Sequence, residues 1–115
     1  MSAPLPQRGE VWTVSFSPSR GSGQRGVRPA LVIQNDVGNR YGATTIVAAI
    51  TTTLKIYPVT VPLKKGEGGL SQPSMANFAQ ILTVDKSRLL HRMGALSSER
   101  MEMVNAAIKV SLDVG

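Results

Sequence analysis

The sequence predicts a small, mostly β protein, in which a β-barrel is followed by one C-terminal α-helix. Short apolar segments separated by turn residues fill most of the chain, and the hydrophobic period becomes helical only near residue 97. The 115 residues are enough for one modest core. We therefore expect a single domain over residues 1–115, with residues 1–7 as a disordered N-terminal arm.

The first three strands are predicted from alternation and from short apolar runs. Residues 11–16 alternate between apolar and polar side chains, as in a strand with one buried face. Residues 30–34 and 46–50 are continuous apolar runs rich in branched side chains, and they are too short for helices. Such runs are typical of central strands that are covered on both faces.

The residue pattern in the second half of the chain predicts three more strands. Residues 58–63 form one of them, and Pro62 places it towards an edge of the sheet because proline cannot donate to a ladder. Residues 64–73 hold three glycines and two adjacent lysines, so we expect a solvated surface loop. Further strands are expected over 74–83 and 89–95, joined by a turn or a single helical turn.

The C-terminal segment has the spacing of an amphipathic helix. Met101, Val104, Ile108 and Leu112 step by three and four residues, and Ser97 can cap the start. We expect the apolar face of this helix to close the barrel. Because that face is wider than one stripe, an alternative is that part of it meets a second subunit, and we predict a homodimer.

The charge of the chain indicates a polyanionic partner. The net charge is +6 and the isoelectric point is about 10.3. Five of the thirteen basic residues fall in the first forty positions, and all five are arginine, whose planar group grips phosphate with two hydrogen bonds. Three of them lie in or beside the glycine-rich segment 18–29, which suits a polyanion and favours RNA.

Several classes of protein are disfavoured by composition. No apolar run is long enough to span a bilayer and no export signal is visible, which favours the cytoplasm. There are no cysteines, the acids are scattered, and His91 is the only histidine, so we expect no metal site and no cofactor. We interpret His91 as a core or interface residue.

Arginine and hydroxyl groups are then the candidates for chemistry. Arg28 precedes a proline at the mouth of one predicted strand, and Thr51 ends another. If these two strands are adjacent and antiparallel, the guanidinium and the hydroxyl lie at the same end of the sheet and can face one phosphate. The plain alternative is an ordinary strand threonine and a surface arginine.

Several stretches of this sequence resemble MazF/PemK-type toxins of bacterial toxin–antitoxin pairs. They are RGEVW, PSRGSGQRGVRPALVIQNDVGNR, TTIVAAIT, AQILTVDKSRL and the C-terminal helix. The resemblance implies an SH3-like barrel of the kind shared with CcdB. It also implies a homodimeric, metal-independent, sequence-specific endoribonuclease that acts on single-stranded RNA. Its partner would be an antitoxin with an acidic, flexible tail.

By this resemblance Arg28 is the catalytic arginine and Thr51 the catalytic hydroxyl. The residues expected to bind RNA are Arg20, Gln24, Arg25, Asn35, Asp36, Thr52, Thr53, Lys55 and Gln80. The implied reaction is attack of a ribose 2′-hydroxyl on the neighbouring phosphate. The chain departs from the family pattern at Gly23, Ala79 and Leu82, which leaves the recognised base sequence open.

Two other functions remain open on the sequence. One is an RNA-binding barrel that does not cleave, although an aromatic content of 4% is low for a protein that stacks bases. The other is a topoisomerase poison of the CcdB kind. The activity of that family depends on a C-terminal tryptophan, whereas the one tryptophan here is Trp12.

Overall fold

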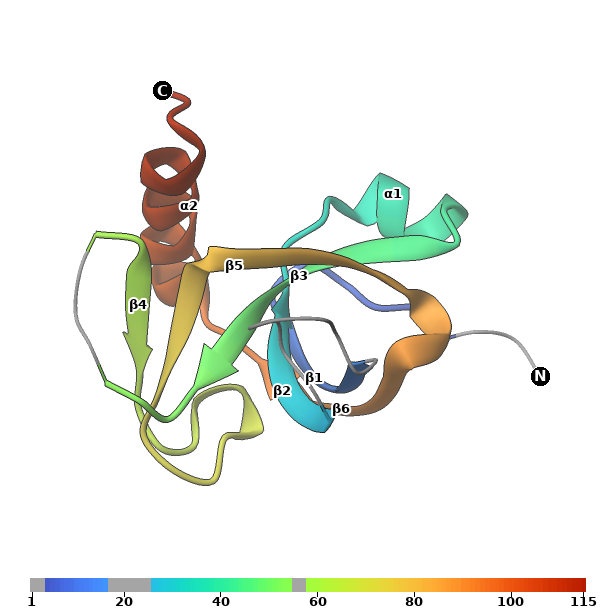
Figure 1. Ribbon diagram of the computed structural model, residues 1–115, viewed down its shortest axis with the longest axis horizontal. Coiled ribbons are helices and arrows are strands. Elements are labelled where there is room, and N and C mark those ends of the chain that lie inside the picture. Colours follow the sequence, from blue (N-terminus) through green and yellow to red (C-terminus); the bar gives the residue numbers. More distant parts are fainter. Residues whose placement is uncertain (1–3, 17–25, 55–57) are drawn as a thin grey trace.

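The computed structural model describes residues 4–16, 26–54 and 58–115, and Figure 1 shows the arrangement of their elements. The strands are β1 (Glu10–Phe16), β2 (Gly26–Val32), β3 (Thr44–Thr51), β4 (Thr60–Leu63), β5 (Ser74–Asp85) and β6 (Leu89–Ala95). The helices are α1 (Asp36–Tyr41), α2 (Ser98–Leu112) and two 3-10 turns, η1 (Glu67–Gly69) and η2 (Lys86–Arg88). The short helical turn expected before the last strand is therefore present.

The strands form one antiparallel sheet in the order β4-β5-β3-β2-β1-β6. The two apolar runs predicted as central strands are β2 and β3, and both lie inside the sheet. The strand with Pro62 is β4, which lies at an edge as predicted. The sheet curls on itself, and α2 stands beside β4 and β5 while α1 lies towards the other end of β5 (Figure 1).

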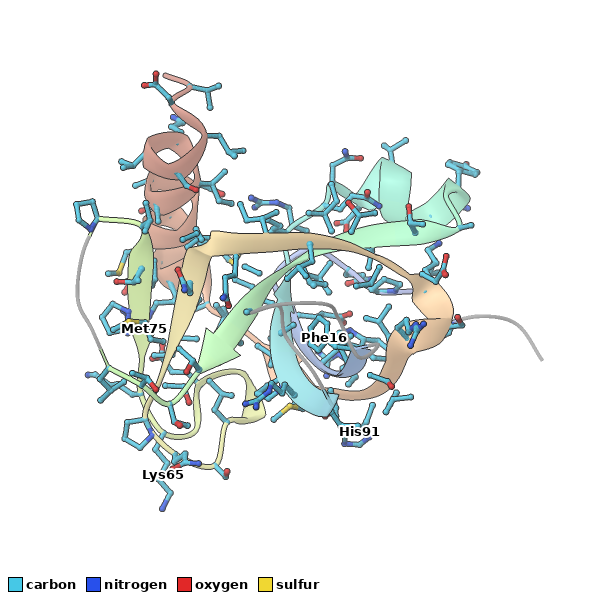
Figure 2. All side chains as sticks on the ribbon, viewed as in Figure 1. Phe16, Lys65, Met75 and His91 are labelled. Carbon is cyan, nitrogen blue, oxygen red and sulfur yellow. The ribbon has the colours of Figure 1, made fainter. Side chains whose placement is uncertain are left out.

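Apolar side chains are buried on both faces of the sheet, because successive residues of a strand point to opposite sides. One cluster includes Val11, Leu31, Ala48, Ile50, Phe78, Val104 and Ala107. The other is formed by Val14, Phe16, Ala30, Val32, Val47 and Leu89. Figure 2 shows Phe16 inside the curl of the strands. The predicted barrel with a C-terminal helix is confirmed.

A bulge in β5 bends the sheet. Ala48 pairs with Ile81, yet the next residue, Ala49, pairs with Asn77. The pairing register therefore skips the three intervening residues of β5, which include Gln80. Such an insertion bends a strand and re-aims its side chains. The bend lets one long strand contribute to both buried clusters.

Helix α2 covers β4 and β5 with one face only. The Ser97 side chain accepts a hydrogen bond from the backbone N–H three residues on, at 3.2 Å, which is the predicted N-cap. Val104 and Ala107 are buried against the sheet, whereas Met103 and Val110 remain 45% and 56% exposed. Part of the apolar face thus closes the barrel, and another part faces outwards.

Helix α1 was not predicted, because its six residues, DVGNRY, are too few to show a hydrophobic period. Asn35 caps the helix, and its side-chain oxygen accepts a hydrogen bond from the third residue on. The buried Asn39 accepts a 2.6 Å hydrogen bond from the hydroxyl of Thr45. Asp36 accepts one of 2.7 Å from the backbone N–H of Arg8. Side-chain hydrogen bonds hold α1 in place of an apolar stripe.

The prediction of a solvated loop over residues 64–73 is wrong for its central part. Gly68 and Gly69 have left-handed φ angles of 59° and 77°, and a Cβ atom on Gly69 would lie 2.1 Å from the Met93 carbonyl oxygen of β6. Leu70 is 4% exposed and belongs to the core. The segment docks on the sheet through backbone contacts that only glycine permits.

Part of the expected N-terminal arm is also in place. Pro6 is buried, and the Gln7 backbone N–H donates a 2.8 Å hydrogen bond to the Glu10 carboxylate. Residues 1–3 lie outside the described residues. Pro6 and Gln7 thus contact the rest of the fold, whereas Leu5 remains 59% exposed.

Candidate active site

Arg28 and Thr51 lie on neighbouring antiparallel strands, which meets the condition set for their meeting at one end of the sheet. The β2–β3 ladder pairs Ala30 with Ala49, and extending this register by two residues places Arg28 opposite Thr51. The ladder stops short of them because Pro29 has no N–H to donate. Residues that face each other in this way have Cβ atoms about 5 Å apart. The two side chains can therefore act on one group.

Both side chains line a cavity of about 350 Å³ at this end of the sheet. The polar groups around it are hydroxyls, one amide and one guanidinium, from Thr13, Arg28, Thr51, Thr52, Ser71, Gln72 and Ser74. Among the described residues that line it, Arg28 is the one charged side chain and none is a carboxylate. Such a lining favours an anionic group.

The hydroxyl of Thr51 is oriented by its own turn. Its Oγ1 accepts a 3.1 Å hydrogen bond from the backbone N–H of Thr53. An oxygen that already accepts from the backbone keeps its hydrogen for a second partner. Thr51 is thus arranged to donate to an anion in the cavity.

The segment between β4 and β5 supplies a wall of this cavity that the sequence did not reveal. Ser71 and Gln72 line it, together with Ser74, whose hydroxyl donates a 2.9 Å hydrogen bond to the Gln72 carbonyl. These residues are far from Arg28 and Thr51 in the chain and carry no motif. The glycines before them are compatible with close packing as well as with the solvated surface loop that the sequence predicted.

An ion pair holds that segment to α2. Glu67 accepts hydrogen bonds from Arg100 at 2.9 and 3.1 Å and from the backbone N–H of Lys64 at 2.6 Å. Burial by itself raises the pKa of Glu67, but the Lys64 N–H and the Arg100 guanidinium outweigh it and the pKa lies below its ordinary value. Glu67 therefore stays ionised and fixes the wall.

Of the other predicted RNA-binding residues, some lie at the cavity and others lie elsewhere in the structure. Thr52 lines the cavity and Thr53 supplies the N–H described above. Asn35 and Asp36 are engaged in α1, and Gln80 lies half-buried in the β5 bulge. None of these three is among the described residues that line the cavity. Predicted residues outside the described parts of the chain are Arg20, Gln24, Arg25 and Lys55.

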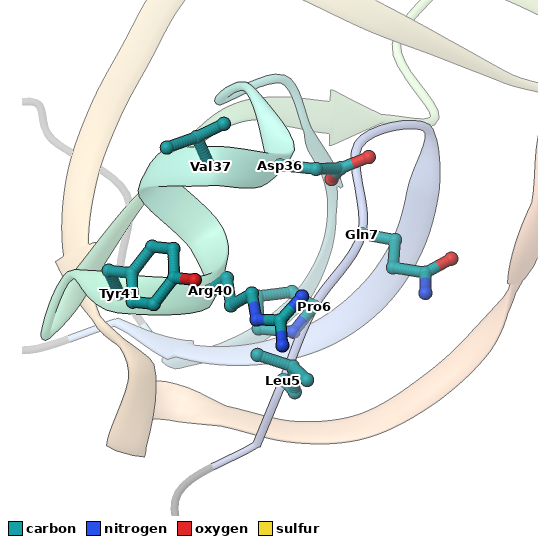
Figure 3. Close-up of a pocket in the computed structure, with 7 residues that line it drawn as sticks. All are labelled: Leu5, Pro6, Gln7, Asp36, Val37, Arg40 and Tyr41. Carbon is teal, nitrogen blue, oxygen red and sulfur yellow. The ribbon is translucent and has the colours of Figure 1, made fainter.

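A separate cavity of about 500 Å³ lies between the N-terminal segment and α1 (Figure 3). Leu5, Pro6 and Val37 contribute apolar surface to it. The guanidinium carbon of Arg40 lies 5.5 Å from the centre of the Tyr41 ring, which is a cation–π distance. This cavity contains neither Arg28 nor Thr51, so the pair defines the smaller cavity as the candidate active site.

Of the two expected places for His91, the core is wrong, and the interface stays a prediction. His91 is exposed, and Figure 2 shows it at the outer edge of the strands. Within the described ranges, no three histidine, aspartate or glutamate side chains gather as metal ligands would. No helix in these ranges is both long and apolar enough to cross a membrane.

Solved toxin structures share this fold. An endoribonuclease in complex with its cognate antitoxin from Mycobacterial species superposes with a TM-score of 0.83 at 24% identity, covering 96% of this chain and 97% of that one. MazF from Deinococcus radiodurans gives a TM-score of 0.79 at 24% identity, covering 96% and 99%. The predicted SH3-like barrel of the CcdB and MazF type is confirmed.

Residues 7–112 match the family described as PemK-like, MazF-like toxin of type II toxin–antitoxin system, and the chain belongs to this family. Endoribonuclease MazF of Staphylococcus saprophyticus is 44% identical over 109 residues, covering 92% of this chain and 90% of the relative. Endoribonuclease EndoA of Bacillus subtilis is 43% identical over 108 residues, covering 92% and 93%.

Proposed function

We propose that this toxin is a sequence-specific endoribonuclease that cleaves single-stranded RNA in the cavity of Arg28 and Thr51. The observation that carries the proposal is that Arg28 and Thr51, on neighbouring antiparallel strands, line one cavity whose described lining has no carboxylate. A phosphodiester fits this lining, and the relatives that are 43% and 44% identical are named endoribonucleases. RNA as substrate implies the cytoplasm as the compartment.

The reaction is attack of a ribose 2′-oxygen on the adjacent phosphorus. A 2′-oxygen–phosphorus bond forms, the bond to the 5′-oxygen breaks, and the products are a 2′,3′-cyclic phosphate and a 5′-hydroxyl. The 2′-hydroxyl loses a proton and the leaving oxygen gains one. The nucleophile belongs to the substrate, so the reaction requires no activated water and no metal to activate it.

Arg28 and Thr51 have different tasks in this reaction. The Arg28 guanidinium binds the non-bridging oxygens, whose negative charge grows in the transition state. Thr51 donates its hydroxyl hydrogen to a phosphate oxygen, because its own oxygen already accepts from the Thr53 N–H. Arginine stays protonated in proteins and is therefore a poor general base. Alignment and electrostatics then supply most of the rate.

Substituting Arg28 with lysine tests this assignment. The Arg28→Lys variant keeps the positive charge and loses the planar two-bond grip on phosphate. We expect cleavage of a long RNA to fall by about a hundredfold or more, the size of effect seen when one transition-state donor is removed. An Arg40→Lys variant on α1 is the matched control and should cleave normally. Near-normal cleavage by Arg28→Lys contradicts the assignment.

The partners that follow from this function are a second copy of the chain and an acidic antitoxin. The exposed Met103 and Val110 on α2 support a subunit interface, and the net charge of +6 supports an acidic protein ligand. The mycobacterial structure named above contains a cognate antitoxin. Light scattering at micromolar concentration should give a dimer mass, and a monomer mass argues against the interface.

A further inference from the structure

A third cavity, of about 320 Å³, lies beside the candidate active site. Leu54, Pro62 and Pro73 form apolar surface in it, and Lys64 and Lys65 supply positive charge. Leu54, Pro62 and both lysines are exposed to solvent. Figure 2 shows Lys65 extending away from the sheet. The cavity thus combines an apolar surface with cationic side chains.

The two cavities are adjacent. Ser74 lines both of them. Thr51 lines the first and Leu54 the second, and three residues span at most about 10 Å of chain. Gln72 and Pro73 are adjacent in sequence and also line one cavity each. A strand that places a phosphate beside Thr51 therefore reaches the second cavity within a short distance.

The charge at the second cavity is positive. Lys64, Lys65 and Arg100 line it, and Glu67 is the carboxylate beside them. Arg100 is held by Glu67 at 2.9 and 3.1 Å, so one cation and the carboxylate compensate each other. The two lysines add positive charge beyond that pair. A chain of phosphates is the ligand that complements them.

The lysines are also held on a fixed backbone. Leu63, the last residue of β4, is 2% exposed in the core, and the Lys64 N–H donates to the Glu67 carboxylate at 2.6 Å. The glycines after Glu67 dock the segment on β6, as described above. The site is therefore formed before a ligand arrives, which lowers the entropy lost on binding.

We propose that this cavity is a subsite for a nucleotide that flanks the scissile phosphate. Its base rests on Leu54, Pro62 and Pro73, and its phosphate lies between Lys64 and Lys65. This inference rests on the proposed function, since it extends the path of an RNA bound at the active site. The two cavities lie side by side, which favours RNA, because the phosphates recur along a strand and can occupy both sites.

The test measures the salt dependence of binding for a Lys64→Ala/Lys65→Ala variant. The ligand is a single-stranded RNA that the wild type cleaves, made uncleavable by a 2′-deoxy nucleotide before the scissile phosphate. Removing two phosphate contacts lowers the slope of log K against log salt by about 1.4 for a single strand. A fourfold rise in salt then weakens wild-type binding about sevenfold more than variant binding.

An Arg40→Ala/Lys109→Ala variant is the matched control, because it removes two positive charges from exposed positions on α1 and α2. Its slope should equal that of the wild type. The RNA is then shortened from its 5′ end and, separately, from its 3′ end. We expect only one of the two shortenings to abolish the difference in slope between the lysine variant and the wild type.

Equal slopes for the lysine variant and the control overturn the subsite. So does an equal loss on full and trimmed RNAs, because the lysines then act at a distance. Cleavage of unmodified RNA by the wild type is scored in parallel. Cleavage without a slope difference overturns the subsite alone, whereas a slope difference without cleavage overturns the ribonuclease and leaves only an RNA-binding contact at Lys64 and Lys65.

Discussion

Replacing Gly69 with alanine tests how firmly the segment between β4 and β5 is docked on the sheet. Gly69 has a φ of 77°, and an added Cβ would lie 2.1 Å from the Met93 carbonyl oxygen and 2.7 Å from its carbon. Gly66, in the same segment, has a φ of 96°, but an added Cβ there meets no atom within 4 Å. Comparing alanine variants at these two glycines separates the cost of backbone strain from the cost of a steric collision.

The expected magnitudes follow from these two geometries. An alanine in the left-handed conformation costs about 1–2 kcal/mol, and Gly66→Ala should lower the free energy of unfolding by this amount only. Gly69→Ala adds a collision with a backbone atom that cannot rotate away. Overpacking suggests a further cost of about 1–3 kcal/mol, which gives about 2–5 kcal/mol in total. The effect of alanine on the unfolded chain is similar in both variants and cancels in their difference.

Urea unfolding followed by circular dichroism measures both variants against the wild type. We expect Gly69→Ala to be less stable than Gly66→Ala by at least 1 kcal/mol. We also expect it to cleave RNA more slowly at temperatures where it remains folded, since Ser71 and Gln72 move with the segment. Equal unfolding midpoints for the two variants would show that the segment is not packed on β6, and the reasoning would fail.

Two further predictions concern buried polar groups. Thr45→Val removes the 2.6 Å hydrogen bond to Asn39 and should lower the free energy of unfolding by about 1–3 kcal/mol. Thr45→Ser keeps the hydroxyl donor and should lower this free energy less. Equal urea midpoints for the two variants contradict this prediction. Burial raises the pKa of Glu10, but hydrogen bonds from Arg92, Trp12 and the backbone outweigh it, and the pKa lies below its ordinary 4.5. The stability that Glu10 contributes is then complete above pH 4.5 and is lost as the pH falls through the lower folded value. Urea unfolding between pH 7 and pH 2 should show a shallower decline for Glu10→Gln than for the wild type, and parallel declines would refute the role of this carboxylate.

The parts of the fold that the sequence predicted are those with a strong local pattern. The branched runs of β2 and β3 could only be covered strands, and their adjacency placed Arg28 and Thr51 at one end of the sheet. The period of α2 and the Ser97 cap were likewise explicit in the sequence.

The parts that were missed depend on contacts between residues distant in sequence. Helix α1 is held by Asn39 and by the bond from Arg8 to Asp36, neither of which leaves a periodic signal. Gly68 and Gly69 suggested a free loop because glycine marks flexibility and close packing equally well. The position of Gln72 in the cavity wall depends on the packing of Gly68 and Gly69 against β6, and it could not be predicted without that contact.

The most direct test of the central claim is incubation of the purified chain with a long single-stranded RNA in excess EDTA, beside an Arg28→Ala variant. The account predicts discrete fragments with 5′-hydroxyl ends from the wild type and intact RNA from the variant. RNA that stays intact with the wild type but is retarded on a gel would contradict it and indicate a barrel that binds RNA without cleaving it.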